Sequence, residues 1–138
     1  EPAFESGGAG LVSTIDDYAA FAQMLLHNGS FRDTRLLSPK TVEFMTGARL
    51  NPALQDYVNQ WENLPGYTYA NLLRIMISPD TAVSMGSRGE YGWDGWLGPY
   101  MTNDPANRLT LLIMQQKTNS GTTEYTRKIR NLVFSALS

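Results

Sequence analysis

Residues 89–116 read GEYGWDGWLGPYMTNDPANRLTLLIMQQ, and this stretch carries the clearest fold signal in the chain. Residues 89–102 combine glycines and aromatic side chains in a strand-like pattern. The run Asp104-Pro105-Ala106-Asn107 consists of residues that favour turns. Residues 108–116 predict a strand whose apolar residues, Leu109, Leu111, Leu112, Ile113 and Met114, form a near-continuous run, which is typical of a strand covered on both faces. The stretch therefore predicts strands joined by a tight turn.

The segment that precedes this stretch predicts one more strand. Residues 67–77 are rich in Tyr, Leu and Ile and follow the breaker Pro65-Gly66. The dipeptide Pro79-Asp80 indicates a turn after them. Residues 49–65 are expected to be irregular because prolines interrupt them.

A first helix is predicted after Thr14, which is a good N-cap, with Asp17 three residues on in an approximate capping box. Apolar residues between positions 15 and 26 fall on one face at helical spacing. Gly29 is expected to end the helix at the C′ position.

A second helix is expected from Ser38, with Pro39 at its first position, to Gly47. Residues 122–137 predict a final amphipathic helix. Its apolar side is expected to hold Tyr125, Ile129, Leu132, Val133 and Leu137. The fold class is therefore α+β: an antiparallel sheet of three to four strands, with two N-terminal helices and a C-terminal helix packed on it.

Composition narrows the classes of function. The chain has 138 residues, 42% hydrophobic and 17% charged, which suits one compact domain over residues 1–138. The net charge of -2 gives no attraction to nucleic acid. There is no cysteine and only one histidine, His27. Disulfides, thiolate metal sites and His-cluster metal sites are therefore excluded, and a Ser-His-Asp triad is disfavoured.

Three motifs together resemble the serine β-lactamase, D,D-peptidase and esterase family, including the class C β-lactamase-related hydrolases. The first is Gly7-Gly8-Ala9-Gly10-Leu11-Val12-Ser13-Thr14, which resembles the glycine-rich segment leading into a helix. The second is Leu36-Leu37-Ser38-Pro39-Lys40-Thr41-Val42, and the third is Tyr91-Gly92-Trp93-Asp94-Gly95. The resemblance implies that this chain is the C-terminal part of a longer β-lactamase-like fold.

The resemblance implies candidate catalytic residues at Trp93, Asp94, Gly95 and Trp96. Trp93-Asp94-Gly95 holds the position of the family's Lys-Thr-Gly strand, and the Trp96 backbone N–H holds that of an oxyanion donor. Gly95 would let a substrate approach the backbone closely. A carboxylate of Asp94 facing the pocket would repel an anionic substrate, which favours neutral esters or amides. Asp94 could instead point away, because alternate strand residues face opposite sides. Equally, Trp93, Trp96 and Tyr100 could be aromatic residues of the sheet and core.

The family's nucleophile is not found in this sequence. No Ser-x-x-Lys occurs, and Ser38-Pro39-Lys40 has the spacing of a helix cap rather than of a catalytic pair. The strings Tyr57-Val58-Asn59 and Tyr69-Ala70-Asn71 follow the glycine-rich segment, whereas the family's Tyr-x-Asn element precedes it. We therefore expect Tyr69 to pack in a strand and His27 to lie in a helix cap.

Two functions remain open. In the first, the chain supplies one wall of a serine hydrolase that acts on a small-molecule or peptide substrate without a cofactor, and it is inactive alone. In the second, it is a non-catalytic module of the same fold that binds a peptide or glycan. The missing N-terminal part is the expected partner, and an exposed sheet edge favours a homodimer or strand exchange. The resemblance implies an extracytoplasmic or cell-envelope location.

Overall fold

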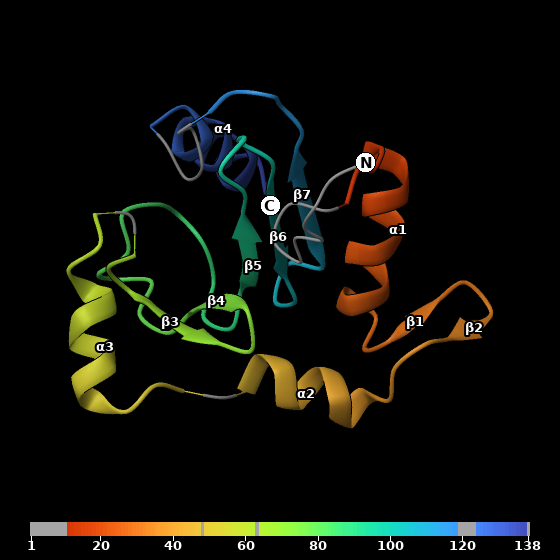
Figure 1. Ribbon diagram of the computed structural model, residues 1–138, viewed down its shortest axis with the longest axis horizontal. Helices are drawn as coiled ribbons and strands as arrows, with labels where there is room; N and C mark the ends of the chain where they lie inside the picture. Colours follow the sequence, from red (N-terminus) through yellow and green to blue (C-terminus); the bar gives the residue numbers. More distant parts are fainter. Residues whose placement is uncertain (1–10, 48, 63, 119–123, 138) are drawn as a thin grey trace, which may run out of the picture.

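The computed structural model describes residues 11–47, 49–62, 64–118 and 124–137. Its main sheet has five antiparallel strands in the order β3-β4-β5-β6-β7, and a separate hairpin pairs β1 with β2 (Figure 1). The glycines at positions 7–10 of the first family motif lie outside the described residues. The elements are α1 (Ile15–Leu26), β1 (Ser30–Phe31), β2 (Thr34–Arg35), α2 (Pro39–Gly47), α3 (Pro52–Asn59), β3 (Tyr67–Ala70), β4 (Leu73–Met76), β5 (Tyr91–Asp94), β6 (Tyr100–Asp104), β7 (Leu109–Ile113) and α4 (Glu124–Ser135).

The predicted α+β class with an antiparallel sheet is confirmed, and the sheet has five strands rather than three to four. Residues 67–77 form two strands because Asn71 and Leu72 both have positive φ, 48° and 69°, which makes a tight two-residue turn. Residues 89–102 likewise contain β5 and the start of β6. The turn predicted at residues 104–107 is confirmed, since the Asn107 N–H donates to the Asp104 carboxylate at 3.1 Å.

The expectation that residues 49–65 are irregular is wrong over α3. Asn51 caps this helix by accepting a hydrogen bond from the Leu54 N–H at 3.0 Å, and Pro52 occupies its first turn. Proline is tolerated there because the first helical N–H groups have no partner within the helix. Pro52 therefore begins a helix here and does not break one.

Helix α1 begins and ends close to the predicted positions. The Thr14 hydroxyl accepts a hydrogen bond from the Asp17 N–H at 3.2 Å, and His27 is the C-cap. Asn28, with φ of 53°, occupies C′, and the following Gly29 N–H donates to the Met24 carbonyl at 2.8 Å. This is a Schellman arrangement. Gly29 therefore lies one position beyond the expected C′.

Helices cover the two faces of the sheet. Figure 1 shows α1 and α4 on opposite sides of β6 and β7. On the α1 side, the buried Asn103 amide donates to the Ala22 carbonyl at 2.7 Å and so fixes α1 to β6. The core beneath α1 and α2 consists of Ala22, Met24, Leu25, Val42, Ala70, Leu73, Ile75, Tyr91 and Met101.

Helix α4 packs on the sheet as expected, but with a different face. Thr126, Arg130 and Phe134 are its buried residues, whereas Tyr125 and Leu132 are 61% and 70% exposed. The predicted apolar side is therefore only partly buried, since Ile129 and Val133 are half-buried, and the ion pair of Arg130 with Glu90 lies on the face turned to the sheet. Residues 122–123 of the expected helix lie outside the described residues.

Candidate active site

Four consecutive residues, the last two of β5 and the two that follow it, line one pocket of about 420 Å³. These are the four residues that the sequence singled out: Trp93, Asp94, Gly95 and Trp96. The other lining residues are Tyr18 of α1, Pro99 just before β6, Tyr100 and Met101 of β6, and Met114 just after β7. The pocket therefore lies where α1 approaches the last strands of the sheet.

Trp93 lies on the α1 side of the sheet. It pairs across β5 and β6 with Met101, which belongs to the core under α1. The Tyr69 ring meets the Trp93 ring edge-on, with 5.2 Å between centroids, so Tyr69 packs in its strand as expected. Trp93 is 37% exposed and Trp96 is 71% exposed. Both indoles are therefore accessible to a ligand.

A tight turn follows β5. The Gly98 N–H donates to the Gly95 carbonyl at 2.9 Å, and the Gly95 N–H donates to the Pro99 carbonyl at 2.8 Å. A Cβ atom at Gly95 would lie 2.8 Å from the Pro99 ring. The Leu97 and Gly98 carbonyls accept hydrogen bonds from Lys117 N–H and the Gln115 amide. The turn that carries Trp96 is thus fastened to the segment after β7.

Asp94 forms an ion pair with Arg74 on the neighbouring strand, with 2.8 Å between Oδ1 and Nη1. The Arg74 side chain is 2% exposed and that of Asp94 is 19% exposed. Arg74 also stacks over the Tyr100 ring at 4.5 Å and donates to the Met101 carbonyl. The carboxylate at the pocket is therefore compensated. Asp94 pairs across the strands with Tyr100, whereas Trp93 pairs with Met101, so the two side chains face opposite sides of the sheet. This is the second of the two orientations that the sequence left open for Asp94.

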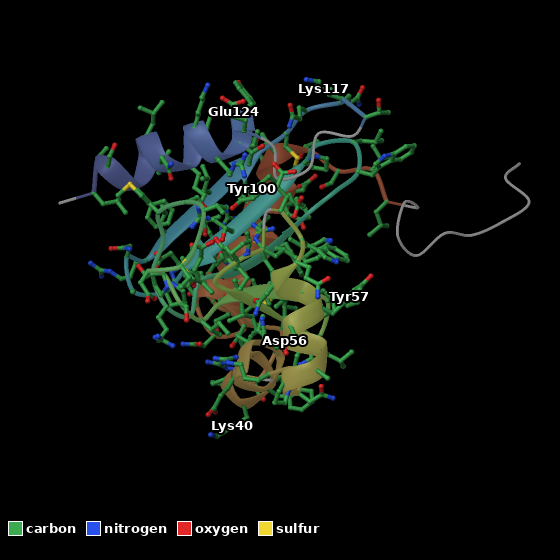
Figure 2. The ribbon with its side chains drawn as sticks, turned by 90° about the vertical axis from the view of Figure 1, so that its left-hand side faces the viewer. Lys40, Asp56, Tyr57, Tyr100, Lys117 and Glu124 are labelled. Carbon is green, nitrogen blue, oxygen red and sulfur yellow. The ribbon has the colours of Figure 1, made fainter. Side chains whose placement is uncertain are left out.

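A second buried ion pair lies behind the first. Arg130 of α4 binds Glu90, which directly precedes β5, and both side chains are fully buried. The Thr102 hydroxyl also donates to Glu90 at 2.6 Å, and Arg130 Nη1 donates to the Tyr100 hydroxyl at 2.8 Å. Tyr100 therefore joins the two ion pairs. Figure 2 shows Tyr100 among the strands and α4 beside them.

Sequence reasoning missed Arg74, Glu90 and Arg130. The one available signal was Arg74, an isolated charge in the otherwise apolar run 72–77, whereas Glu90 and Arg130 lie near other charged residues in the sequence. All three side chains are buried by the fold. Isolated charges of this kind are seldom buried unless they are paired. Their pairing became visible only once the strand order was known.

The buried layer shifts the ionisation of its members. Burial works against the charge on Arg130, but the hydrogen bond with Glu90 and the electrostatic attraction of nearby groups together outweigh it, so the pKa of Arg130 lies above its usual value. Burial raises the pKa of Tyr67, which lies beside this layer, to about 12. Arg130 therefore stays charged and Tyr67 stays neutral across the physiological range.

A larger hollow of about 780 Å³ adjoins the pocket and shares Tyr18, Pro99 and Met114 with it. Most of its other lining side chains are apolar and come from residues 11–15, α1 and the turn after β5: Leu11, Val12, Ile15, Phe21 and Leu97. Asp17 is its one charged lining residue among those that the structure describes. The site is therefore an aromatic pocket beside an apolar hollow.

The other sequence candidates lie elsewhere. Ser38 Oγ accepts a hydrogen bond from the Thr41 N–H at 3.1 Å as a helix cap, and Lys40 pairs with Glu43 at the surface. Tyr57 projects from α3, and its ring meets that of Trp61 at 6.2 Å (Figure 2). Neither pocket is lined by Tyr57, Trp61 or His27.

Comparison with known proteins gives the family. The sequence matches the Beta-lactamase family over residues 1–134, and the chain belongs to that family. It is 32% identical over 121 residues to Protein Rv1367c of Mycobacterium tuberculosis, covering 83% of this chain and 30% of that protein. It is 29% identical over 115 residues to a putative D-alanyl-D-alanine carboxypeptidase of Escherichia coli K12, covering 83% and 24%.

A solved structure shares the fold of this chain. Unliganded simvastatin synthase (LovD) from Aspergillus terreus superposes with a TM-score of 0.64 at 20% identity. The match covers 86% of this chain and 33% of LovD. The chain thus spans about a quarter to a third of the proteins that it resembles.

The described residues include neither a metal-binding cluster nor a membrane-spanning helix. No group of three or more His, Cys, Asp or Glu side chains gathers there in a way that could hold a metal ion. No helix in that part of the chain is both long and apolar enough to cross a bilayer.

Proposed function

We propose that this chain forms one wall of the active site of a serine hydrolase. The reaction is hydrolysis of an ester, amide or β-lactam through an acyl-serine, with the nucleophile supplied from outside this chain. One observation carries the proposal: Trp93, Asp94, Gly95 and Trp96, at the Lys-Thr-Gly position of the family, line a single pocket. Membership of the Beta-lactamase family supports it.

Each residue of this wall has a distinct task. Trp93 offers an accessible aromatic face, held by Tyr69. Gly95 lets a substrate approach the backbone, and the Trp96 backbone N–H is the proposed donor to the oxyanion. Asp94 carries a charge that Arg74 balances, so it holds the end of the strand and does not act as a base.

A second function keeps the same pocket without catalysis. The sequence has no Ser-x-x-Lys, so a module that binds a peptide or glycan is consistent with this chain. The named relative in Escherichia coli is a putative D-alanyl-D-alanine carboxypeptidase, which favours the hydrolase. It also supports a location at the cell envelope.

Activity tests should compare this chain with the longest natural form of the protein that contains it. Suitable substrates are nitrocefin, p-nitrophenyl acetate and a D-Ala-D-Ala peptide, with fluorescent penicillin and a fluorophosphonate as acylating probes. We expect the long form to react with at least one and the chain alone with none. Catalysis depends on the nucleophile, and its loss removes nearly all of the rate.

A matched pair of tryptophan variants assigns the activity to this pocket. Trp93→Ala in the long form should lower the acylation rate about tenfold, a loss of about 1.4 kcal/mol in transition-state stabilisation. Trp61→Ala should leave the rate unchanged, because Trp61 lines neither pocket. No reaction of the long form with any substrate or probe would favour the binding module, and turnover by the chain alone would contradict the proposed source of the nucleophile.

A further inference from the structure

Tyr18 of α1 lies where the two hollows of the candidate site meet. It lines both the pocket of about 420 Å³ and the adjoining hollow of about 780 Å³. Its ring meets that of Phe21 with 5.8 Å between centroids and packs against the core beneath α1 and α2. Apolar contacts therefore hold the ring, and the phenolic hydroxyl at its end needs a polar partner of its own.

The Tyr18 hydroxyl has no hydrogen-bond partner among the residues that the structure describes. Burial raises the pKa of this phenol, and no hydrogen bond contributes to the shift. The hydroxyl is nevertheless not enclosed, because Nε of Arg130 is the one buried side-chain nitrogen or oxygen without a partner in the described part of the chain. The hydroxyl therefore reaches the accessible surface and is open to a ligand.

Two other polar side chains in these walls already have protein partners. The Tyr100 hydroxyl accepts a hydrogen bond from Arg130 Nη1 at 2.8 Å, and the Gln115 amide donates to the Gly98 carbonyl at 2.8 Å. Tyr18 differs from them because the protein takes up none of its hydrogen-bonding capacity. A ligand can therefore bind this hydroxyl without breaking a hydrogen bond of the fold.

Tyr18 and Trp93 approach the pocket from two elements on the same side of the sheet. Trp93 pairs with Met101, a core residue beneath α1, and Tyr18 belongs to α1 itself. The indole of Trp93, which is 37% exposed, offers a face for an aromatic ring. The Tyr18 phenol stays protonated at physiological pH because burial raises its pKa, so it can donate to an acceptor oxygen.

We propose that Tyr18 is a ligand-binding residue of this pocket, whose hydroxyl donates a hydrogen bond to the carbonyl oxygen of an aromatic ester or amide while the ring of that ligand lies against Trp93. The inference deepens the proposed function and rests on it, since it names the substrate class of the same pocket. It adds a residue of α1 to the wall that β5 and the turn after it provide.

Phenylacetamide and ethylbenzene test this hydrogen bond, because they share a benzene ring and only phenylacetamide carries a carbonyl oxygen. Binding to this chain is followed by the NMR signal of the Trp93 indole N–H, assigned with Trp93→Phe, with the Trp61 indole as internal reference. Tyr18→Phe should weaken the binding of phenylacetamide about fivefold, the factor that corresponds to about 1 kcal/mol for one neutral hydrogen bond. The binding of ethylbenzene should stay the same.

Stability distinguishes a binding role of the hydroxyl from a structural one. Tyr18→Phe should leave the urea unfolding midpoint unchanged, because the lost hydroxyl has no partner within the described residues. Tyr57→Phe is the matched control and should change neither binding nor stability, since Tyr57 lines neither hollow.

Three binding results would overturn the proposal: no binding of phenylacetamide by the wild-type chain, unchanged binding of it by Tyr18→Phe, or an equal loss for both ligands. A lower unfolding midpoint of Tyr18→Phe would also overturn it, because the hydroxyl would then serve the fold. The binding assay needs no nucleophile, so failure of the long form to hydrolyse any substrate is a separate result.

Discussion

Gly86 lies against the buried Glu90–Arg130 pair. A Cβ atom at this position would overlap both the Glu90 carboxylate and the Arg130 guanidinium group. We expect Gly86→Ala to separate the pair and to lower the free energy of unfolding by roughly 3 kcal/mol, as for other disrupted buried ion pairs. Urea unfolding followed by circular dichroism would measure the loss.

Gly47→Ala is the matched control for this substitution. Gly47 ends α2, its φ is not positive, and an added Cβ atom would meet nothing within 4 Å. Its free energy of unfolding should rise by about 0.4 to 1 kcal/mol, because alanine fits this helical position and reduces the freedom of the unfolded chain. Equal losses at Gly86 and Gly47 would mean that the ion pair is not the reason for glycine at position 86.

Tyr67 should make stability fall at alkaline pH. Its pKa is about 12 in the folded chain because of burial, against 10.0 for the free side chain. Above pH 10 the unfolded state releases the phenolic proton while the folded state still holds it, so ionisation favours unfolding. The contribution is complete below pH 10 and is lost by about pH 12, and two pKa units amount to about 2.7 kcal/mol.

Tyr67→Phe provides the comparison for the alkaline range. Urea unfolding midpoints of the wild-type chain should fall between pH 9 and pH 11.5 more steeply than those of Tyr67→Phe. Ionisation of exposed Lys and Tyr residues affects both proteins alike and cancels in the difference. Parallel pH profiles would show that Tyr67 ionises normally in the folded chain.

At the residue scale the sequence singled out Trp93, Asp94, Gly95 and Trp96, whose catalytic role stays a prediction, and it missed the buried charged residues Arg74, Glu90 and Arg130. Trp93, Asp94, Gly95 and Trp96 were found because they follow one another along the chain at a recognisable motif position. Arg74 and Asp94 are 20 residues apart and meet only across two strands. A contact that depends on strand pairing leaves little local signal, so the sequence left the orientation of Asp94 open and gave no indication of its partner.

The hairpin between β3 and β4 is the element most at odds with its local sequence. Both residues of its turn have positive φ, and one of them is Leu72, 78% exposed. A left-handed conformation costs a residue with a side chain about 1 kcal/mol, and Asn-Gly is the preferred sequence for such a turn. Leu72→Gly should therefore raise the free energy of unfolding by about 0.5 to 1 kcal/mol.

Leu36→Gly tests whether this gain depends on backbone conformation. Leu36 is also exposed, at 65%, but is not among the residues with positive φ. Glycine should lower stability there by about 0.5 to 1 kcal/mol, because it adds freedom to the unfolded chain. Thermal unfolding of both variants would show opposite shifts, and a loss at both positions would contradict the argument.

This hairpin also explains why the sequence predicted three to four strands where the main sheet has five. Leucine in a left-handed turn gives no turn signal, so residues 67–77 were interpreted as one continuous strand. Helix α3 was missed for a related reason, since Pro52 was taken as a breaker although it occupies the first turn of a helix. The caps at Thr14 and Ser38 were predicted because a single side chain makes each contact to a nearby N–H.

At the scale of the whole molecule, β7 has one unpaired edge. Within the described residues β6 is its only neighbouring strand, and all five of its residues are half-buried. The strand reads Leu-Thr-Leu-Leu-Ile, without a charge or proline to discourage pairing. We predict that the isolated chain associates through this edge, as a homodimer or by strand exchange, and that sedimentation equilibrium will show a species heavier than the 15.4 kDa monomer.

Lysine at the centre of this edge should prevent the association. In a symmetric antiparallel pairing centred on Leu111, the two copies of that residue lie opposite each other, so Leu111→Lys places like charges face to face. Leu72→Lys adds the same side chain at the tip of the β3–β4 hairpin and should leave the association intact. A wild-type chain that stays monomeric at high concentration would contradict the prediction. If Leu72→Lys abolishes the dimer and Leu111→Lys does not, the contact lies at the β3–β4 hairpin. Pairing along the edge of β7 would bring the two copies of position 111 together, so it could not survive Leu111→Lys.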